Sequence, residues 1–222
     1  MTVKEKFVNS VFKVLFSLTC RLDIDGLENI PSKGPAILIS NHTSNLEGPL
    51  YYIKLRPRKT IALAKKELWD KSFTRLAMTA WNSIPVDREG MDLKALRSCF
   101  DVLDNGNFLC IAPEGTRSRD GRLKKAMPGT TYFALRKKVP IYPMVQWGLN
   151  GFSENIKHFR RTVVHVRIGK PFYVEKKEGG RLTPEKRQKM ADEMMYKLAE
   201  LLPPEYRGYY SSIPAEYEFI HE

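Results

Sequence analysis

Short apolar runs alternate with helix-length segments along most of this chain, and this alternation restricts the folds it can adopt. The run Ala-Ile-Leu-Ile-Ser at 36–40 is continuous and β-branched, as in a strand buried on both faces. The same reasoning predicts further strands at 59–63, 83–86, 107–112, 140–146 and 162–168, and helices at 66–80, 91–104, 125–137 and 183–201. This order predicts an α/β fold with a mostly parallel central sheet flanked by helices.

An amphipathic helix is expected before the sheet. Its apolar residues recur at steps of three and four, with lysines between them: Val3, Phe7, Val11, Val14 and Leu18. Two interpretations stay open at this point. The apolar face docks onto the protein's own core, or it lies in a membrane interface where the lysines attract anionic lipid.

The charge of the chain indicates an anionic partner. Lys and Arg number 37 against 25 Asp and Glu, which gives a net charge of +12. Nucleic acid, an anionic membrane surface and a phosphorylated substrate all fit this excess. Two windows carry much of it: 54–75 has eight basic and two acidic residues, and 157–170 has five basic residues and no acidic one. The mean hydropathy of −0.39 excludes a polytopic membrane protein.

Cys20, Cys99 and Cys110 make an odd count without metal-ligand spacing, so we expect free thiols and no metal site. Cys99 and Cys110 fall inside a predicted helix and a predicted strand. No serine lies in a Gly-x-Ser-x-Gly elbow either. A covalent acyl-enzyme therefore has no evident nucleophile.

Three polar clusters follow predicted strands, at 41–47, 87–89 and 113–118. If these strands are parallel, the clusters converge on the carboxyl edge of the sheet, where open α/β folds bind ligands. Within the first cluster, His42 is a candidate general base, and Glu47 could orient its imidazole. The alternative is a structural histidine, because a spacing of five residues alone is weak.

Three cations near this edge could hold an anionic acceptor: Arg88, Arg117 and Lys65 (or Lys66). Ordinary solvation at the surface is the alternative for each. The tail at 203–222 has no clear periodicity, so no regular structure is predicted there.

Taken together, four blocks closely resemble the pattern of the 1-acyl-sn-glycerol-3-phosphate acyltransferase family over about 21–150. They are Asn41-His42-x4-Glu47, Ile84-Pro85-Val86-Asp87-Arg88, Pro113-Glu114-Gly115-Thr116-Arg117-Ser118 and Val139-Pro140-Ile141-Tyr142-Pro143. The resemblance implies transfer of a fatty acyl group from acyl-CoA or acyl carrier protein to the 2-hydroxyl of lysophosphatidate, which makes phosphatidate for phospholipid biosynthesis. It implies no cofactor.

Carried over by position, the resemblance makes His42 the general base. Glu47 stands where the family normally has aspartate, which keeps the carboxylate but lengthens its reach. Other matched positions are associated with the glycerol phosphate (Arg88, Glu114, Gly115, Thr116 and Arg117) or with the acyl donor (Ile141 and Pro143).

Because this function acts on lipids, we expect a membrane-associating helix at 1–20, an acyltransferase domain at 21–222, and an anionic membrane surface as a partner. The expected location is peripheral, at the cytoplasmic face of the cell membrane. Three alternatives stay open: an acyltransferase for another acceptor, such as glycerol 3-phosphate or a lysophospholipid; a basic nucleic-acid-binding module; and an inactive membrane-binding relative. The lipid reaction explains the charge without nucleic acid, and no nucleic-acid motif is present.

Overall fold

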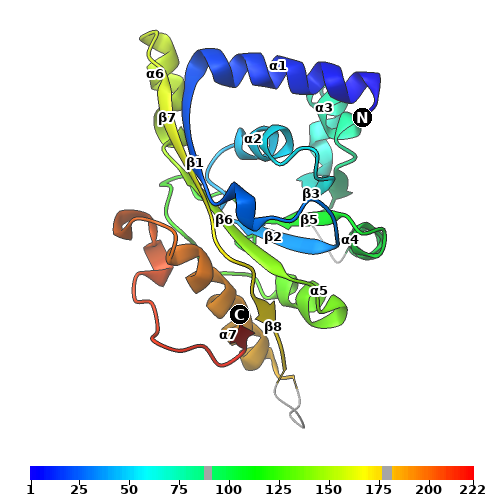
Figure 1. Cartoon of the computed structure of the whole chain (residues 1–222), viewed down its shortest axis with the longest axis vertical. Coiled ribbons are helices and arrows are strands. Elements are labelled where there is room, and N and C mark those ends of the chain that lie inside the picture. The colour runs from blue at the N-terminus through cyan, green and yellow to red at the C-terminus, as the bar shows by residue number, and fades with distance from the viewer. Residues whose placement is uncertain (88–91, 177–181) are drawn as a thin grey trace.

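A seven-stranded sheet forms the centre of the molecule, in the order β1-β7-β6-β2-β5-β3-β4 (Figure 1). The computed structural model describes residues 1–87, 92–176 and 182–222. Five neighbouring strand pairs are parallel and β6 with β7 is antiparallel, so the prediction of a mostly parallel sheet is confirmed. The strands are β1 (Cys20–Asp25), β2 (Ala36–Ser40), β3 (Thr60–Lys65), β4 (Ile84–Val86), β5 (Phe108–Ile111), β6 (Ile141–Trp147) and β7 (Thr162–Ile168).

Helices cover both faces of this sheet. One face carries α1 (Val3–Thr19), α2 (Glu47–Lys54) and α3 (Ser72–Ala80), and the other carries α4 (Leu93–Asp104), α5 (Gly129–Lys137) and α7 (Pro184–Ala199). The short α6 (Phe152–Lys157) precedes β7, and β8 (Tyr173–Val174) pairs with β9 (Ile220–His221). The 3-10 helices are η1 (Leu27–Asn29), η2 (Lys66–Trp69), η3 (Leu149–Gly151), η4 (Pro204–Tyr206) and η5 (Gly208–Tyr210).

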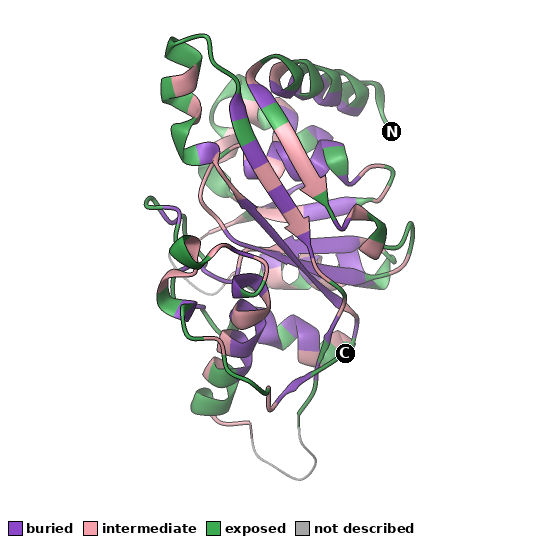
Figure 2. Cartoon of the chain, turned by 60° about the vertical axis from the view of Figure 1, so that its left-hand side comes forward, coloured by how far each residue is buried: buried purple, intermediate pink, exposed green. Residues whose placement is uncertain are grey.

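Strand β2 shows why the sheet is stable. All five of its residues are buried, because alternate side chains enter two separate cores. Ile37 and Ile39 pack with residues of α4, α5 and α7, and Leu38 packs with residues of α1, α2 and α3. Figure 2 shows the result, with buried residues concentrated in the central strands and in the inner faces of the helices.

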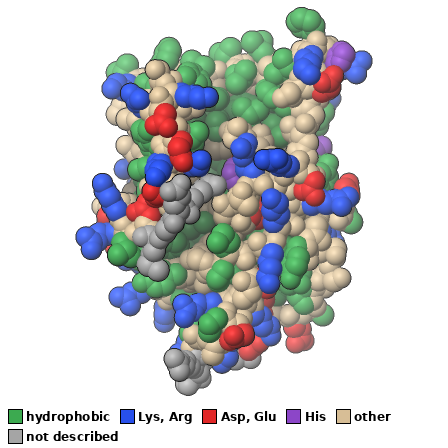
Figure 3. Space-filling model, turned by 180° about the vertical axis from the view of Figure 1, so that it is seen from behind, with side chains coloured by type: hydrophobic (Ala, Val, Ile, Leu, Met, Phe, Trp, Pro, Cys, Tyr) green, Lys and Arg blue, Asp and Glu red, His purple; other side chains and the backbone are tan. Residues whose placement is uncertain are grey.

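Helix α1 has two apolar faces. The Thr2 side chain caps its start by accepting a hydrogen bond from Glu5 N at 3.2 Å. Val8, Phe12 and Phe16 are buried in the core shared with α2 and α3. The opposite face leaves Val3, Phe7, Val11, Val14 and Leu18 exposed. The helix therefore docks onto its own core and still presents an apolar surface, which Figure 3 shows along the upper end of the molecule.

Several predicted elements differ in detail. The helix expected at 66–80 is two helices, η2 and α3, because Lys71 between them has an extended backbone. The helix expected at 125–137 begins at Gly129, after Pro128 at its N-cap. The helix at 183–201 is α7, and Thr183 caps it as its sequence suggests. Strands β8 and β9 and helix α6 were not predicted, because elements of two to six residues carry too little periodicity.

The burial of α1 predicts a contrast between two phenylalanines of the same helix. Phe16→Ala removes a side chain that is 2% exposed, and Phe7→Ala removes one that is 59% exposed. We expect Phe16→Ala to lower the free energy of unfolding by about 3–5 kcal/mol, and Phe7→Ala to change it by less than about 0.5 kcal/mol. Urea unfolding in detergent-free buffer measures both. Equal losses would mean that the helix does not dock through the Phe16 face.

Candidate active site

Two of the three predicted polar clusters, 41–47 and 113–118, meet where the strands leave the sheet, and the third, 87–89, lies mostly outside the described residues. Strands β2, β3, β4 and β5 run parallel, so the segments that follow them emerge at the same edge. The loop from β2 to α2 carries His42, and the long loop from β5 to α5 carries Glu114 and Arg117. This edge is the candidate active site.

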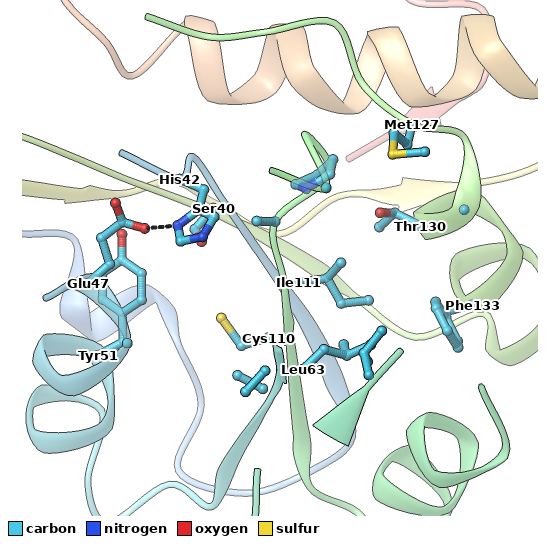
Figure 4. A pocket seen from close by; sticks show the side chains of 18 of the residues that line it. Ser40, His42, Glu47, Tyr51, Leu63, Cys110, Ile111, Met127, Thr130 and Phe133 are labelled. Atoms are coloured by element: carbon cyan, nitrogen blue, oxygen red, sulfur yellow. Dashed lines mark hydrogen bonds and ion pairs between the residues drawn. The ribbon is translucent and has the colours of Figure 1, made fainter. Parts of the chain in front are cut away.

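His42 and Glu47 form a hydrogen-bonded pair. The distance between His42 Nδ1 and Glu47 Oε2 is 2.8 Å (Figure 4). The Glu47 side chain is only 5% exposed, and that of His42 is 27% exposed. Glu47 is the first residue of α2, where the positive end of the helix dipole favours a carboxylate. Because Nδ1 binds the carboxylate, Nε2 of His42 is left for a substrate.

The second oxygen of Glu47 is held by several donors. Oε1 accepts hydrogen bonds from Thr43 Oγ1 at 3.0 Å and from Gln146 Nε2 at 2.8 Å. The backbone N–H groups of Thr43 and Ser44 also donate to it. The glutamate therefore reaches both its own loop and the imidazole, and its departure from the usual aspartate is accommodated by these donors.

Gln146 is a site residue that the sequence did not reveal. It lies on β6 with its side chain fully buried, and its backbone N–H and C=O pair with the Asn41 side chain at 2.9 and 2.8 Å. Asn41 thereby fixes the end of β2 against β6. The sequence signal was slight: one polar side chain at the end of an apolar run, 99 positions from its carboxylate partner.

Glu114 connects the two loops of the site. Its Oε1 accepts a hydrogen bond from His42 N at 2.8 Å, and its Oε2 accepts one from Lys124 N at 3.0 Å. Burial raises the pKa of Glu114 to about 7, against the effect of these two N–H groups. The family resemblance predicts that this side chain contacts substrate; in the structure its two oxygens accept hydrogen bonds from backbone amides. These contacts hold the His42 loop against the loop that carries Glu114.

Glycine is required beside Glu114. Gly115 has φ +67°, and a Cβ there would lie 2.6 Å from Met127 Sδ. Thr116 and Arg117 follow on the exposed part of the loop. The Lys124 ammonium donates to the Arg117 carbonyl at 2.8 Å, so it holds this part of the loop in place. Lys124, too, was missed, because a lysine in a loop carries no signal of its own.

A cavity of about 610 Å³ opens beside His42. As Figure 4 shows, His42, Glu47 and Tyr51 line one end, and Met127, Thr130 and Phe133 line the other. Between them the lining is mostly apolar, with Leu63, Cys110 and Ile111 on the strand ends. Burial raises the pKa of the Cys110 thiol to about 12. The three cysteines are free, as predicted.

This cavity is not lined by the predicted site residues Lys65, Lys66, Ile141 and Pro143. Lys65 ends β3 opposite Val86 of β4, and its ammonium pairs with Glu67 at 3.0 Å. Lys66 pairs with Asp87. Arg88 lies outside the described residues. Ile141 and Pro143 are buried inside β6, paired with Ile37 and Ile39, and do not line the cavity.

Within the described ranges, no group of three or more His, Cys, Asp or Glu side chains could hold a metal ion. In the same part of the chain, no helix combines the length and the apolar character needed to cross a bilayer.

This chain belongs to the Acyltransferase family, whose model matches residues 21–147. A chloroplastic 1-acyl-sn-glycerol-3-phosphate acyltransferase of Brassica napus is 30% identical over 204 residues, covering 86% of this chain and 57% of the relative. The enzyme of that name from Bacillus subtilis is 25% identical, covering 76% of this chain and 82% of its own. This chain thus spans little more than half of the plant relative.

The fold also matches a solved structure. The crystal structure of the 1-acyl-sn-glycerophosphate acyltransferase PlsC from Thermotoga maritima superposes with a TM-score of 0.62 at 25% identity. The match covers 89% of this chain and 79% of the other. The family model covers the sheet from β1 to β6, and with it the His42 and Glu114 loops.

The raised pKa of Glu114 predicts a pH dependence of stability. The folded protein keeps a proton that the unfolded chain releases near the ordinary value of 4.5. The stabilisation from this proton is complete below pH 4.5 and is lost as the pH rises toward 7, by about 3 kcal/mol. Glu114→Gln should remove this decline, whatever its effect on absolute stability. Urea unfolding of both proteins from pH 4.5 to 8 measures it; parallel curves would contradict the raised pKa.

Proposed function

We propose that this chain transfers a fatty acyl group from an acyl thioester to the 2-hydroxyl of 1-acyl-sn-glycerol 3-phosphate. The donor is acyl-CoA or acyl carrier protein, and the product is phosphatidate for phospholipid biosynthesis. One observation carries the proposal: an imidazole oriented by a buried carboxylate stands at the end of an apolar cavity. The names of the Brassica, Bacillus and Thermotoga proteins support the choice of acceptor.

In this reaction His42 Nε2 removes the proton of the acceptor hydroxyl. The alkoxide oxygen attacks the thioester carbonyl carbon, a C–O bond forms and the C–S bond breaks. The imidazolium then gives its proton to the thiolate, which leaves as the free thiol. Glu47 keeps the proton of neutral His42 on Nδ1 and stabilises the imidazolium that forms.

Direct transfer fits the cavity better than a covalent acyl-enzyme. Cys110 is the cysteine of the cavity lining, and its pKa of about 12 keeps the thiol protonated near neutral pH. A protonated thiol is a poor nucleophile. The hydroxyl of the acceptor is therefore the attacking group.

The two ends of the site suit the two parts of a lipid substrate. Apolar side chains such as Leu63, Ile111 and Phe133 would surround a fatty acyl chain. The exposed Arg117, with Thr116 beside it, would bind the glycerol phosphate on the outer part of the loop. Lys65 would add positive charge from the end of β3, and Arg88, which the family resemblance associates with the glycerol phosphate, is proposed to bind the same headgroup. Glu114 would serve the same headgroup by holding this loop against His42.

If the acceptor is a lipid in a membrane, binding to that membrane would explain the exposed apolar face of α1. Val3, Phe7, Val11, Val14 and Leu18 would lie among the headgroups of an anionic membrane, while Lys4, Lys6 and Lys13 contact its surface. The protein would then act at the cytoplasmic face of the cell membrane. The 1–20 segment has both roles in this proposal, because its other face is part of the core.

The first experiment measures thiol release from palmitoyl-CoA and from palmitoyl-acyl carrier protein, with and without lysophosphatidate, in detergent. We expect release that requires lysophosphatidate and falls at least 10²-fold in His42→Ala, as for removal of a general base. Glycerol 3-phosphate and lysophosphatidylcholine are tested as competing acceptors. Release that ignores every acceptor would indicate a thioesterase instead, and no release from either donor would reject the proposal.

Gln146 provides a second test, because it is proposed to act through Glu47. Gln146→Leu removes one hydrogen bond to the carboxylate and should lower kcat about 10- to 100-fold with little change in KM, since such a bond contributes about 1.5–3 kcal/mol. In a Glu47→Ala background the same change should have no further effect on kcat.

The control for this test is Glu193→Gln on α7. It weakens buried contacts to the N–H groups of Glu218 and Phe219, at 3.0 and 2.8 Å. We expect it to lower stability without changing kcat. Additive losses from Gln146→Leu and Glu47→Ala would mean that Gln146 has only a general structural role.

A further inference from the structure

The end of α6 and its connection to β7, residues 156–161 and here called the 156–161 turn, expose a large aromatic side chain. Phe159 is 99% exposed and Ile156 is 41% exposed. Phe159 also has φ +52°, in the left-handed region that bulky residues rarely adopt. In water, both the exposure and the backbone conformation disfavour phenylalanine at this position. Placing the ring in an apolar environment would offset this free-energy cost.

This turn lies against the end of α1. Strand β7 is parallel to β1, and Thr162 pairs with Cys20, which directly follows α1. The Arg161 guanidinium donates to the Cys20 carbonyl, with a distance of 3.1 Å from Nε. Figure 1 shows α1 and α6 at the same end of the molecule, and Figure 3 shows hydrophobic side chains along that end. The turn therefore extends the exposed apolar face of α1.

This end of the molecule includes the edge of the sheet where His42 lies. In the antiparallel pair of β6 and β7, Trp147 lies opposite His165. Thr162 is three residues earlier, so the turn begins about 10 Å beyond the end of β6, at 3.3 Å per residue. Gln146, the neighbour of Trp147, binds Glu47. A surface in contact with the turn is thus close to the edge where His42 lies.

The charges of the turn favour an anionic surface. Lys157, Arg160 and Arg161 are exposed basic residues. The nearby acid is Glu154, which pairs with Lys157 at 3.1 Å and with His158 at 3.0 Å. The turn therefore has three permanently charged basic side chains and one nearby carboxylate, that of Glu154. Basic residues around apolar side chains are typical of segments that insert among anionic lipid headgroups.

We propose that the 156–161 turn is a second membrane contact, which inserts Phe159 and Ile156 into an anionic bilayer beside α1. This inference rests on the membrane location in the proposed function and adds a contact to it. Contact at two places, α1 and the turn, fixes the orientation of the molecule on the bilayer. A projecting tip with basic flanks suits a bilayer better than a groove in a second protein.

The test is sedimentation of the full chain with vesicles of phosphatidylcholine containing 30% phosphatidylglycerol. Phe159→Gly removes the ring and suits the left-handed backbone, so the fold is kept. We expect vesicle binding at least tenfold weaker. Arg160→Gln should weaken binding about fivefold on these vesicles and leave it unchanged on pure phosphatidylcholine. Tyr173→Ser, an exposed tyrosine on β8 at the other end, is the matched control.

A second measurement locates the turn directly. The native cysteines are buried, so Phe159→Cys can be labelled with an environment-sensitive fluorophore. The label should shift to the blue with anionic vesicles, and a label on Tyr173→Cys should not. No shift at position 159 would overturn the proposal, as would unchanged binding by Phe159→Gly. A shift that follows protein concentration without vesicles would indicate a second copy of this chain as the partner instead.

These measurements test the membrane contact of the turn separately from the proposed function. Phe7→Ser on α1 should weaken vesicle binding whether or not the turn inserts. If it does so and Phe159→Gly does not, the second contact is rejected and the membrane location stands. Acyl transfer to lysophosphatidate in detergent needs no vesicle. Its absence would reject the proposed reaction without deciding where the turn lies.

Discussion

The site depends on the way one carboxylate is shared. Glu47 uses Oε2 for the imidazole of His42 and Oε1 for donors from its own loop and from Gln146 on β6. The two oxygens therefore link the start of α2 to β6, the strand beside β2. A carboxylate bound only to the histidine could rotate; this one cannot, because moving either oxygen breaks contacts of the other. The orientation of the His42 imidazole is thus a consequence of the sheet order.

A second buried carboxylate lies close by and has a different electrostatic character. Glu114 binds only neutral backbone amides, and burial raises its pKa, with a smaller contribution from the charge of Glu47. Two ionised carboxylates in one small site would repel each other and any phosphate that enters. The raised pKa of Glu114 leaves this carboxyl partly protonated near pH 7, which reduces such repulsion. Glu114 can then hold the loops together with little cost in charge repulsion.

The sequence predicted the features that depend on local patterns. Periodicity located the strands, and the order of strands and helices placed the polar clusters at one edge, where the structure has those at 41–47 and 113–118. The pairing of His42 with Glu47 was predicted from a spacing that is weak alone, and the family resemblance supported it. Gln146 could not be found this way, since its role depends on β6 lying beside β2 across about a hundred residues. The hydrogen bonds of Glu114 to His42 N and Lys124 N could not be predicted, because a motif identifies a residue without showing where its oxygens point.

The reversed direction of β7 has a consequence for how this architecture can vary. Because β7 runs against β6, the chain between them must leave the sheet and return at the same edge. A parallel strand there would have required a crossover to the opposite edge. The exposed residues at 156–161 in this connection can therefore change in composition without altering the pairing of the strands beside the loops that carry His42 and Glu114. The size and polarity of this projecting turn can therefore differ between related proteins without a change in the residues around His42.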